Sequence, residues 1–175
     1  MNVSYSGLRR DTSPDPLEVS RHGPQTINQA GGNKAPTTPK RSLHILCIDD
    51  DEQILEMMKD CLTHFEHRVR AASGGKYGME LFRTAMLKSE PYEVVITDLG
   101  MPEVDGRVVA RTIRAESPNT PIIMMTGWGV IMKEEGETIP DVDVVVNKPP
   151  RMRELNDLLL RMAKPAWQPV QNLVF

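Results

Sequence analysis

From Leu43 onward, short apolar runs alternate with segments whose apolar residues recur at helical spacing, and this alternation restricts the fold more than any other feature. The predicted strands are His44–Asp49, Arg68–Ala72, Tyr92–Thr97, Pro121–Met125 and Val142–Asn147. The predicted helices are one with an apolar face from Ile54 to Phe65, then Lys76–Lys88, Asp105–Glu116, a short one within Gly127–Pro140, and Arg153–Lys164. Strict alternation of strands and helices predicts an α/β fold, with a five-stranded parallel sheet covered by helices on both faces.

The connections between strands limit their order in the sheet. Right-handed crossovers leave few topologies, and the order 2-1-3-4-5 places the first strand beside the third. This adjacency would bring Asp49 and Asp50, at the end of the first strand, next to Asp98, at the end of the third. The sequence therefore predicts an acidic cluster at the carboxyl edge of the sheet.

Two further strands deliver polar side chains to the same edge. Thr126 ends the fourth strand and Lys148 follows the fifth. Taken singly, each polar residue has an ordinary structural interpretation, because acids cap helices, threonine is common in strands and lysine usually extends to the surface. Together, carboxylates suit a magnesium ion and the hydroxyl and ammonium suit a phosphoryl group. Asp51 remains the predicted cap of the first helix.

The segment from Leu43 to about Lys164 resembles the receiver domain of two-component response regulators. The matching motifs are Ile-Leu-Cys-Ile-Asp49-Asp50, Val-Val-Ile-Thr-Asp98-Leu-Gly-Met-Pro102 with Asp105-Gly106, Ile-Met-Met-Thr126-Gly127, and Val-Asn-Lys148-Pro149. The resemblance implies a flavodoxin-like, three-layer αβα architecture. It also implies a role for each site residue: Asp98 as phosphoacceptor; Asp49, Asp50, Asp98 and the Gly100 carbonyl around Mg²⁺; Thr126 and Lys148 on phosphoryl oxygens; and a cis peptide bond before Pro149.

The same resemblance implies a signalling function. A sensor histidine kinase or a phosphotransfer protein would donate a phosphoryl group to Asp98 with Mg²⁺, and the modified domain would bind an unknown downstream protein differently. Self-phosphorylation and dephosphorylation would be its only chemistry, so a conventional turnover enzyme is not expected. The chain departs from the family pattern at Val145, where receivers usually carry an aromatic residue.

Composition sets the remaining expectations. Residues 1–42 contain five prolines and little apolar periodicity, and they are predicted to be a disordered extension of a receiver domain at 43–164. The 11 residues of 165–175 are predicted to be a short tail, too small for an output domain. The absence of a long apolar run and of the apolar core of a secretory signal indicates a cytoplasmic protein without membrane insertion. Residues 1–42 carry a charge balance of +3 but no aromatic or basic cluster, so direct nucleic-acid binding is not expected.

The residues leave two other functions open. One is a phosphorylation-independent binding module on a receiver scaffold. Val145 and the weak helix predicted within Gly127–Pro140 are compatible with this alternative. The other is a haloacid-dehalogenase-like phosphatase, in which Asp49 and Asp51 would be nucleophile and acid. The chain could also be a stand-alone receiver or the receiver of a hybrid sensor kinase.

Overall fold

The computed structural model describes residues 41–127, 139–163 and 173–174. Its elements are β1 (His44–Asp49), α1 (Glu52–His64), β2 (Arg68–Ser73), α2 (Gly75–Leu87), β3 (Val94–Asp98), α3 (Gly106–Glu116), β4 (Ile122–Thr126), β5 (Val144–Asn147), α5 (Met152–Met162) and β6 (Leu173–Val174). The predicted helix within Gly127–Pro140 and the predicted extension at 1–42 lie almost entirely outside the described residues. Within the described residues, no helix is long and apolar enough to cross a membrane.

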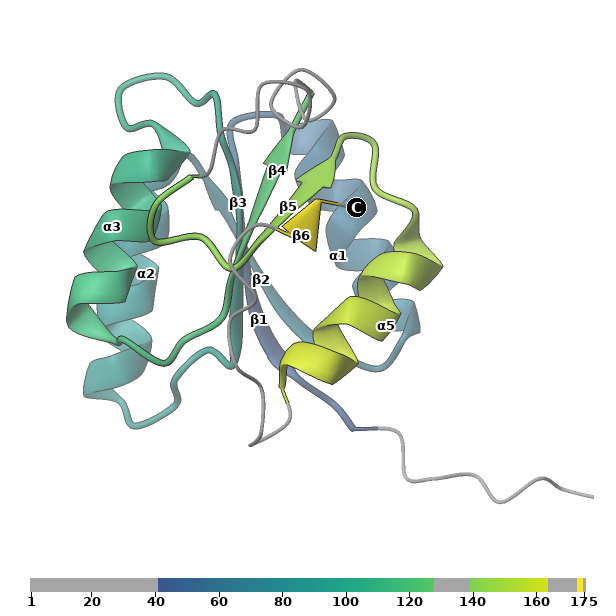
Figure 1. Cartoon of the computed structure of the whole chain (residues 1–175). Helices are drawn as coiled ribbons and strands as arrows, with labels where there is room; N and C mark the ends of the chain where they lie inside the picture. The colour runs from purple at the N-terminus through teal and green to yellow at the C-terminus, as the bar shows by residue number, and fades with distance from the viewer. Residues whose placement is uncertain (1–40, 128–138, 164–172, 175) are drawn as a thin grey trace, which may run out of the picture. The chain divides into compact units, whose positions relative to one another are not determined.

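The strands form one parallel sheet in the order β2-β1-β3-β4-β5-β6 (Figure 1). The predicted order 2-1-3-4-5 is therefore confirmed. A sixth strand, β6, adds two residues beside β5, with Leu173 opposite Val144 and Val174 opposite Val145. The sequence predicted only a tail there, because a two-residue strand is too short to show any periodicity.

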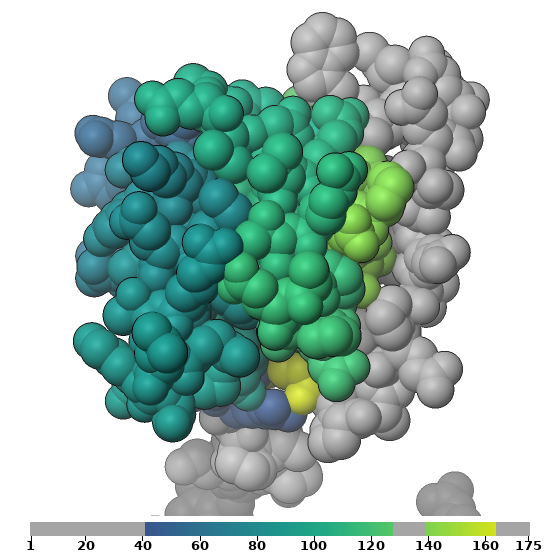
Figure 2. Space-filling model, turned by 90° about the vertical axis from the view of Figure 1, so that its left-hand side faces the viewer, coloured from purple at the N-terminus to yellow at the C-terminus, as the bar shows by residue number. Residues whose placement is uncertain are grey.

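Helices cover both faces of the sheet, so the central strands are buried on both sides. Helices α2 and α3 lie on one face and α1 and α5 on the other (Figure 1), and the outer surface of the α2–α3 face is seen in Figure 2. Every residue of β3 and of β4 is buried. Such fully buried and largely apolar strands are expected in a parallel sheet that helices enclose on both faces.

Two acidic residues begin helices on the carboxyl side of the sheet. Asp51 is the N-cap of α1, and its side chain accepts hydrogen bonds from the backbone N–H groups of Gln53 and Ile54. The predicted capping role of Asp51 is therefore confirmed. Asp105 caps α3 through the N–H of Arg107, so this helix begins one residue later than predicted.

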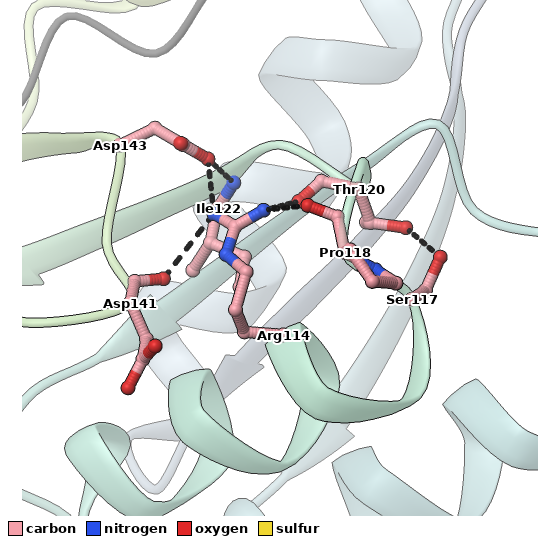
Figure 3. A network of polar contacts seen from close by, with 7 residues as sticks. All are labelled: Arg114, Ser117, Pro118, Thr120, Ile122, Asp141 and Asp143. Atoms are coloured by element: carbon pink, nitrogen blue, oxygen red, sulfur yellow. Dashed lines mark hydrogen bonds and ion pairs between the residues drawn. The ribbon is translucent and has the colours of Figure 1, made fainter.

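A polar network at the opposite edge of the sheet ties three segments together (Figure 3). Arg114, near the end of α3, donates through Nη2 to Asp143 Oδ2 at 2.7 Å. Its guanidinium also donates to three backbone carbonyl oxygens, those of Pro118, Thr120 and Asp141. Asp143 Oδ2 accepts a second hydrogen bond, 2.7 Å long, from the N–H of Ile122 at the start of β4. The network thus fixes the end of α3, the entry to β4 and the approach to β5.

Candidate functional site

Three carboxylates converge at the carboxyl edge of the sheet. Asp49 ends β1, Asp98 ends β3, and these strands are hydrogen-bonded neighbours. One carboxylate oxygen from each of Asp49, Asp50 and Asp98 lies within 4.8 Å of the other two. Asp49 is 1% exposed and Asp98 6%, whereas Asp50 faces solvent. The adjacency of the first and third strands, which the sequence predicted, therefore creates one acidic cluster.

Lys148 joins this cluster from β5. Its Nζ lies 2.7 Å from Asp98 Oδ1 and 2.7 Å from Asp49 Oδ2. The sequence predicted that Lys148 reaches the edge of the sheet that holds the acids, but not that it contacts Asp49. Asp49 Oδ2 is buried, and the Lys148 ammonium lies directly against it. One ammonium thus neutralises part of the charge of three acids.

The electrostatics of the site reflect this surplus of negative charge. Burial raises the pKa of Asp49, the contacts with Lys148 and the Asp51 N–H oppose that rise, and the nearby Asp98 charge adds to it. Burial alone would lower the pKa of Lys148, but its contacts with Asp49 and Asp98 outweigh burial and raise it. The rise at Asp49 therefore comes mainly from burial, with a smaller part from the repulsion of Asp98, whereas the rise at Lys148 comes from its two carboxylate partners. A divalent cation would relieve the same repulsion.

The thiol of Cys47, in the same strand as Asp49, also has a shifted pKa. Cys47 lies two residues before Asp49 in β1 and is 1% exposed. Burial, with a further contribution from the Asp49 charge, raises the pKa of this thiol to about 12. Cys47 is therefore a protonated core residue at neutral pH.

The other predicted site residues lie around the cluster. Thr126 ends β4 with 1% exposure, and its carbonyl oxygen accepts a 3.0 Å hydrogen bond from the Lys148 N–H. The Lys148–Pro149 peptide bond is cis. Gly100, two residues after Asp98, is exposed, and a Cβ added there would meet nothing within 4 Å. The structure thus gathers the acids, the lysine and the threonine at one edge, beside an open loop.

Two supporting contacts were not predicted as parts of the site. The Asp51 N–H donates to Asp49 Oδ1 at 3.0 Å and so fixes the orientation of that carboxylate. A Cβ on Gly106 would lie 2.0 Å from the Asp98 carbonyl oxygen, so α3 packs directly against the backbone of Asp98. The sequence predicted a helix start at Asp105, and the glycine that follows it is the signal that could have revealed this close approach.

The fold and the cluster together define an αβα protein with an acidic site at the carboxyl edge of its parallel sheet, and comparison with known proteins identifies the family. The model of the response regulator receiver domain family matches residues 45–160, and the chain belongs to this family. Receiver domains are signalling modules of two-component systems rather than conventional enzymes, and they act with histidine kinases or phosphotransfer proteins. Membership excludes the haloacid-dehalogenase-like alternative.

Individual relatives agree with this assignment. The chain is 31% identical over 143 residues to the response regulator SaeR of Staphylococcus aureus, which covers 75% of this chain and 57% of SaeR. The chain therefore spans little more than half the length of that relative.

Solved structures show the same architecture. TrrA of Thermotoga maritima, in complex with Mg²⁺–BeF, has 25% identity and a TM-score of 0.56 over 67% of this chain and 96% of TrrA. The chemotaxis protein CheY4 of Vibrio cholerae has 25% identity and a TM-score of 0.59 over 70% of this chain and 99% of CheY4.

Proposed function

We propose that Asp98 accepts a phosphoryl group from a phosphohistidine on a sensor histidine kinase or a phosphotransfer protein. The observation that carries this proposal is the convergence of Asp49, Asp50 and Asp98 within 4.8 Å, with Lys148 2.7 Å from two of them. A structural ion pair needs one acid for one base, whereas this cluster holds a surplus of acids. We take residues 43–164 as the functional domain, and the family match at 45–160 lies within it.

The donor set fits a magnesium ion. All candidate ligands are oxygens, which Mg²⁺ prefers, and one carboxylate oxygen of each acid lies within 4.8 Å of the other two. Asp49, Asp50, Asp98 and the Gly100 carbonyl would hold the ion. When bound, Mg²⁺ would offset the negative charge that the phosphoryl oxygens bring to the acids.

The protein residues would carry out the transfer by position and charge. A carboxylate oxygen of Asp98 attacks phosphorus, the phosphorus–nitrogen bond of the donor breaks, and the donor imidazole leaves neutral or takes a proton from solvent. Lys148 then pairs with the phosphoryl oxygens instead of the Asp98 carboxylate. Thr126 supplies a hydroxyl from the neighbouring strand end, so the loop after β4 responds to the new charge and changes how a downstream protein binds.

Incubation with acetyl phosphate and Mg²⁺, followed by intact mass spectrometry, tests this proposal. The wild-type chain should gain one phosphoryl group, and Asp98→Ala should gain none. Asp60→Ala removes an exposed acid on α1 and serves as the matched control that should still be modified. An adduct that persists in Asp98→Ala contradicts the assignment. A folded wild-type chain that gains none supports the phosphorylation-independent binding module instead.

A further inference from the structure

A small cavity lies beside the last strands of the sheet, between β5 and α5. Its volume is about 360 Å³. Apolar side chains from the two elements contribute much of its wall, and the full lining is Val146, Asn147, Pro149, Arg151, Glu154, Leu155 and Leu158. Leu155 and Leu158 also belong to the core between α5 and the sheet. The cavity is thus an outward extension of that core at the edge of the sheet.

Strand β6 covers only the first half of β5. Leu173 is opposite Val144 and Val174 is opposite Val145, and β5 continues to Asn147. Strand β4 pairs with Val146 and Asn147 from the inner side of β5, but among the described residues no strand pairs with them on the outer side, where β6 lies. If the parallel register continues by one residue, residue 175 lies opposite Val146, which is part of the cavity wall.

The alternation of side chains along β5 decides which face that residue would occupy. Val144 and Val146 belong to the core on the α1–α5 face, whereas Val145 belongs to the core on the α2–α3 face. Paired positions of neighbouring strands point to the same face. The position opposite Val146 therefore faces α5, and this position in the sequence is Phe175.

We propose that the cavity between β5 and α5 is the docking site of Phe175, so that residues 173–175 cover the β5–α5 surface of their own chain. The apolar ring suits a wall that includes Val146, Leu155 and Leu158. A two-residue strand has few hydrogen bonds of its own, and a seated aromatic side chain would hold it in register. An extended apolar segment of another protein can then reach the β5 edge only by displacing this segment.

Nuclear Overhauser contacts in the full-length chain test directly whether Phe175 occupies the cavity. Cross-peaks are expected between the Phe175 ring and the methyl groups of Leu155 and Leu158. In Phe175→Ser, amide exchange in β5 should rise at least tenfold. Val170→Ser is the control, because it makes the same kind of change at a position other than 173–175, the residues to which the proposal assigns the docking. Absent cross-peaks, or an equal effect of Val170→Ser, would overturn the proposal.

A second measurement separates docking within one chain from exchange between chains. A labelled peptide of residues 164–175 should bind full-length Phe175→Ser at least fivefold more tightly than it binds the wild-type chain, whose site is already filled. Sedimentation should show both proteins as monomers. A wild-type dimer that Phe175→Ser converts to monomer would show that the segment docks on a second copy, and it would overturn docking within the chain.

Discussion

Two buried ionic clusters at opposite edges of the sheet are alike in burial and different in charge balance. The side chain of Lys148 is 20% exposed and that of its partner Asp49 is 1% exposed. The side chain of Arg114 is also 20% exposed and that of its partner Asp143 is 3% exposed. Burial therefore does not distinguish the two clusters, and their chemical roles must come from the number of charges and hydrogen bonds.

The Arg114 cluster pairs one base with one acid and satisfies both. Asp143 Oδ2 receives hydrogen bonds from the guanidinium and from the Ile122 N–H (Figure 3). The Lys148 cluster places one base among three acids, and the pKa of Asp49 is raised by burial and, to a smaller extent, by the charge of Asp98. A balanced pair is a structural clamp, whereas a surplus of buried negative charge is a site that a cation or a transferred group can complete.

Breaking the balanced pair should have the largest effect on stability. Asp143→Ala leaves the Arg114 guanidinium and the Ile122 N–H without their carboxylate, and it should lower the free energy of unfolding by about 3–5 kcal/mol. Urea denaturation followed by circular dichroism measures this loss. Asp141→Asn is the control, because Arg114 contacts the Asp141 carbonyl oxygen and not its side chain. A loss below about 1 kcal/mol for Asp143→Ala would show that the network is not a clamp.

Magnesium should stabilise the protein through the unbalanced cluster alone. At 100 times its dissociation constant, Mg²⁺ should raise the free energy of unfolding of the wild type by about 2.7 kcal/mol. Asp141→Asn should keep this gain and Asp49→Asn should lose most of it. Thermal melts with Mg²⁺ and with EDTA measure the difference. An equal gain in Asp49→Asn would place the ion elsewhere.

Neutralising Asp49 in the unbalanced cluster should change the unfolding free energy only slightly, and in the opposite direction to Asp143→Ala. In metal-free buffer at neutral pH, Asp49→Asn should match the wild type or exceed its unfolding free energy by on the order of 1 kcal/mol, because the removed charge is both buried and repelled. Lys148 keeps its pairing with Asp98 in this variant. A loss of several kcal/mol, like that expected for Asp143→Ala, would erase the distinction between the two clusters.

The pH dependence of the unfolding free energy should also distinguish the unbalanced cluster. The pKa of Asp49 in the folded protein lies above the ordinary value of 3.8, so the folded state holds this proton more tightly than the unfolded state. The contribution of Asp49 to the unfolding free energy therefore falls as the pH rises above 3.8. Without metal, the wild-type minus Asp49→Asn difference should become more unfavourable from pH 4 to neutrality. If the difference between wild type and Asp49→Asn does not change with pH, the pKa of Asp49 is not raised in the folded protein.

The sequence predicted the unbalanced cluster and missed the balanced one, for a physical reason. Asp49, Asp98 and Lys148 each follow an apolar strand, and parallel strands bring such positions to one edge. Arg114 and Asp143 are 29 residues apart and belong to a helix end and a loop, where charged residues are ordinary. Nothing in their local pattern predicts that they meet.

Element boundaries show the same limit. Strand β5 was predicted to begin at Val142, yet it begins at Val144. Asp141 has a positive φ of 66°. Asp143 accepts hydrogen bonds from Arg114 and from the Ile122 N–H, so these contacts move the first residue of the strand to Val144. The order of the strands depends on the whole pattern of apolar runs and was predictable, whereas the first residue of each strand depends on such contacts.

The packing of α3 against Asp98 has a consequence for how this chain can diverge. A methyl group at position 106 would collide with the Asp98 carbonyl oxygen, whereas one at position 100 would meet open space. A library randomised at both positions and selected for folding should return glycine alone at 106 and a broad range of side chains at 100. Evolution can therefore alter the exposed side of the acceptor loop freely, while the side that faces the helix has a single permitted residue.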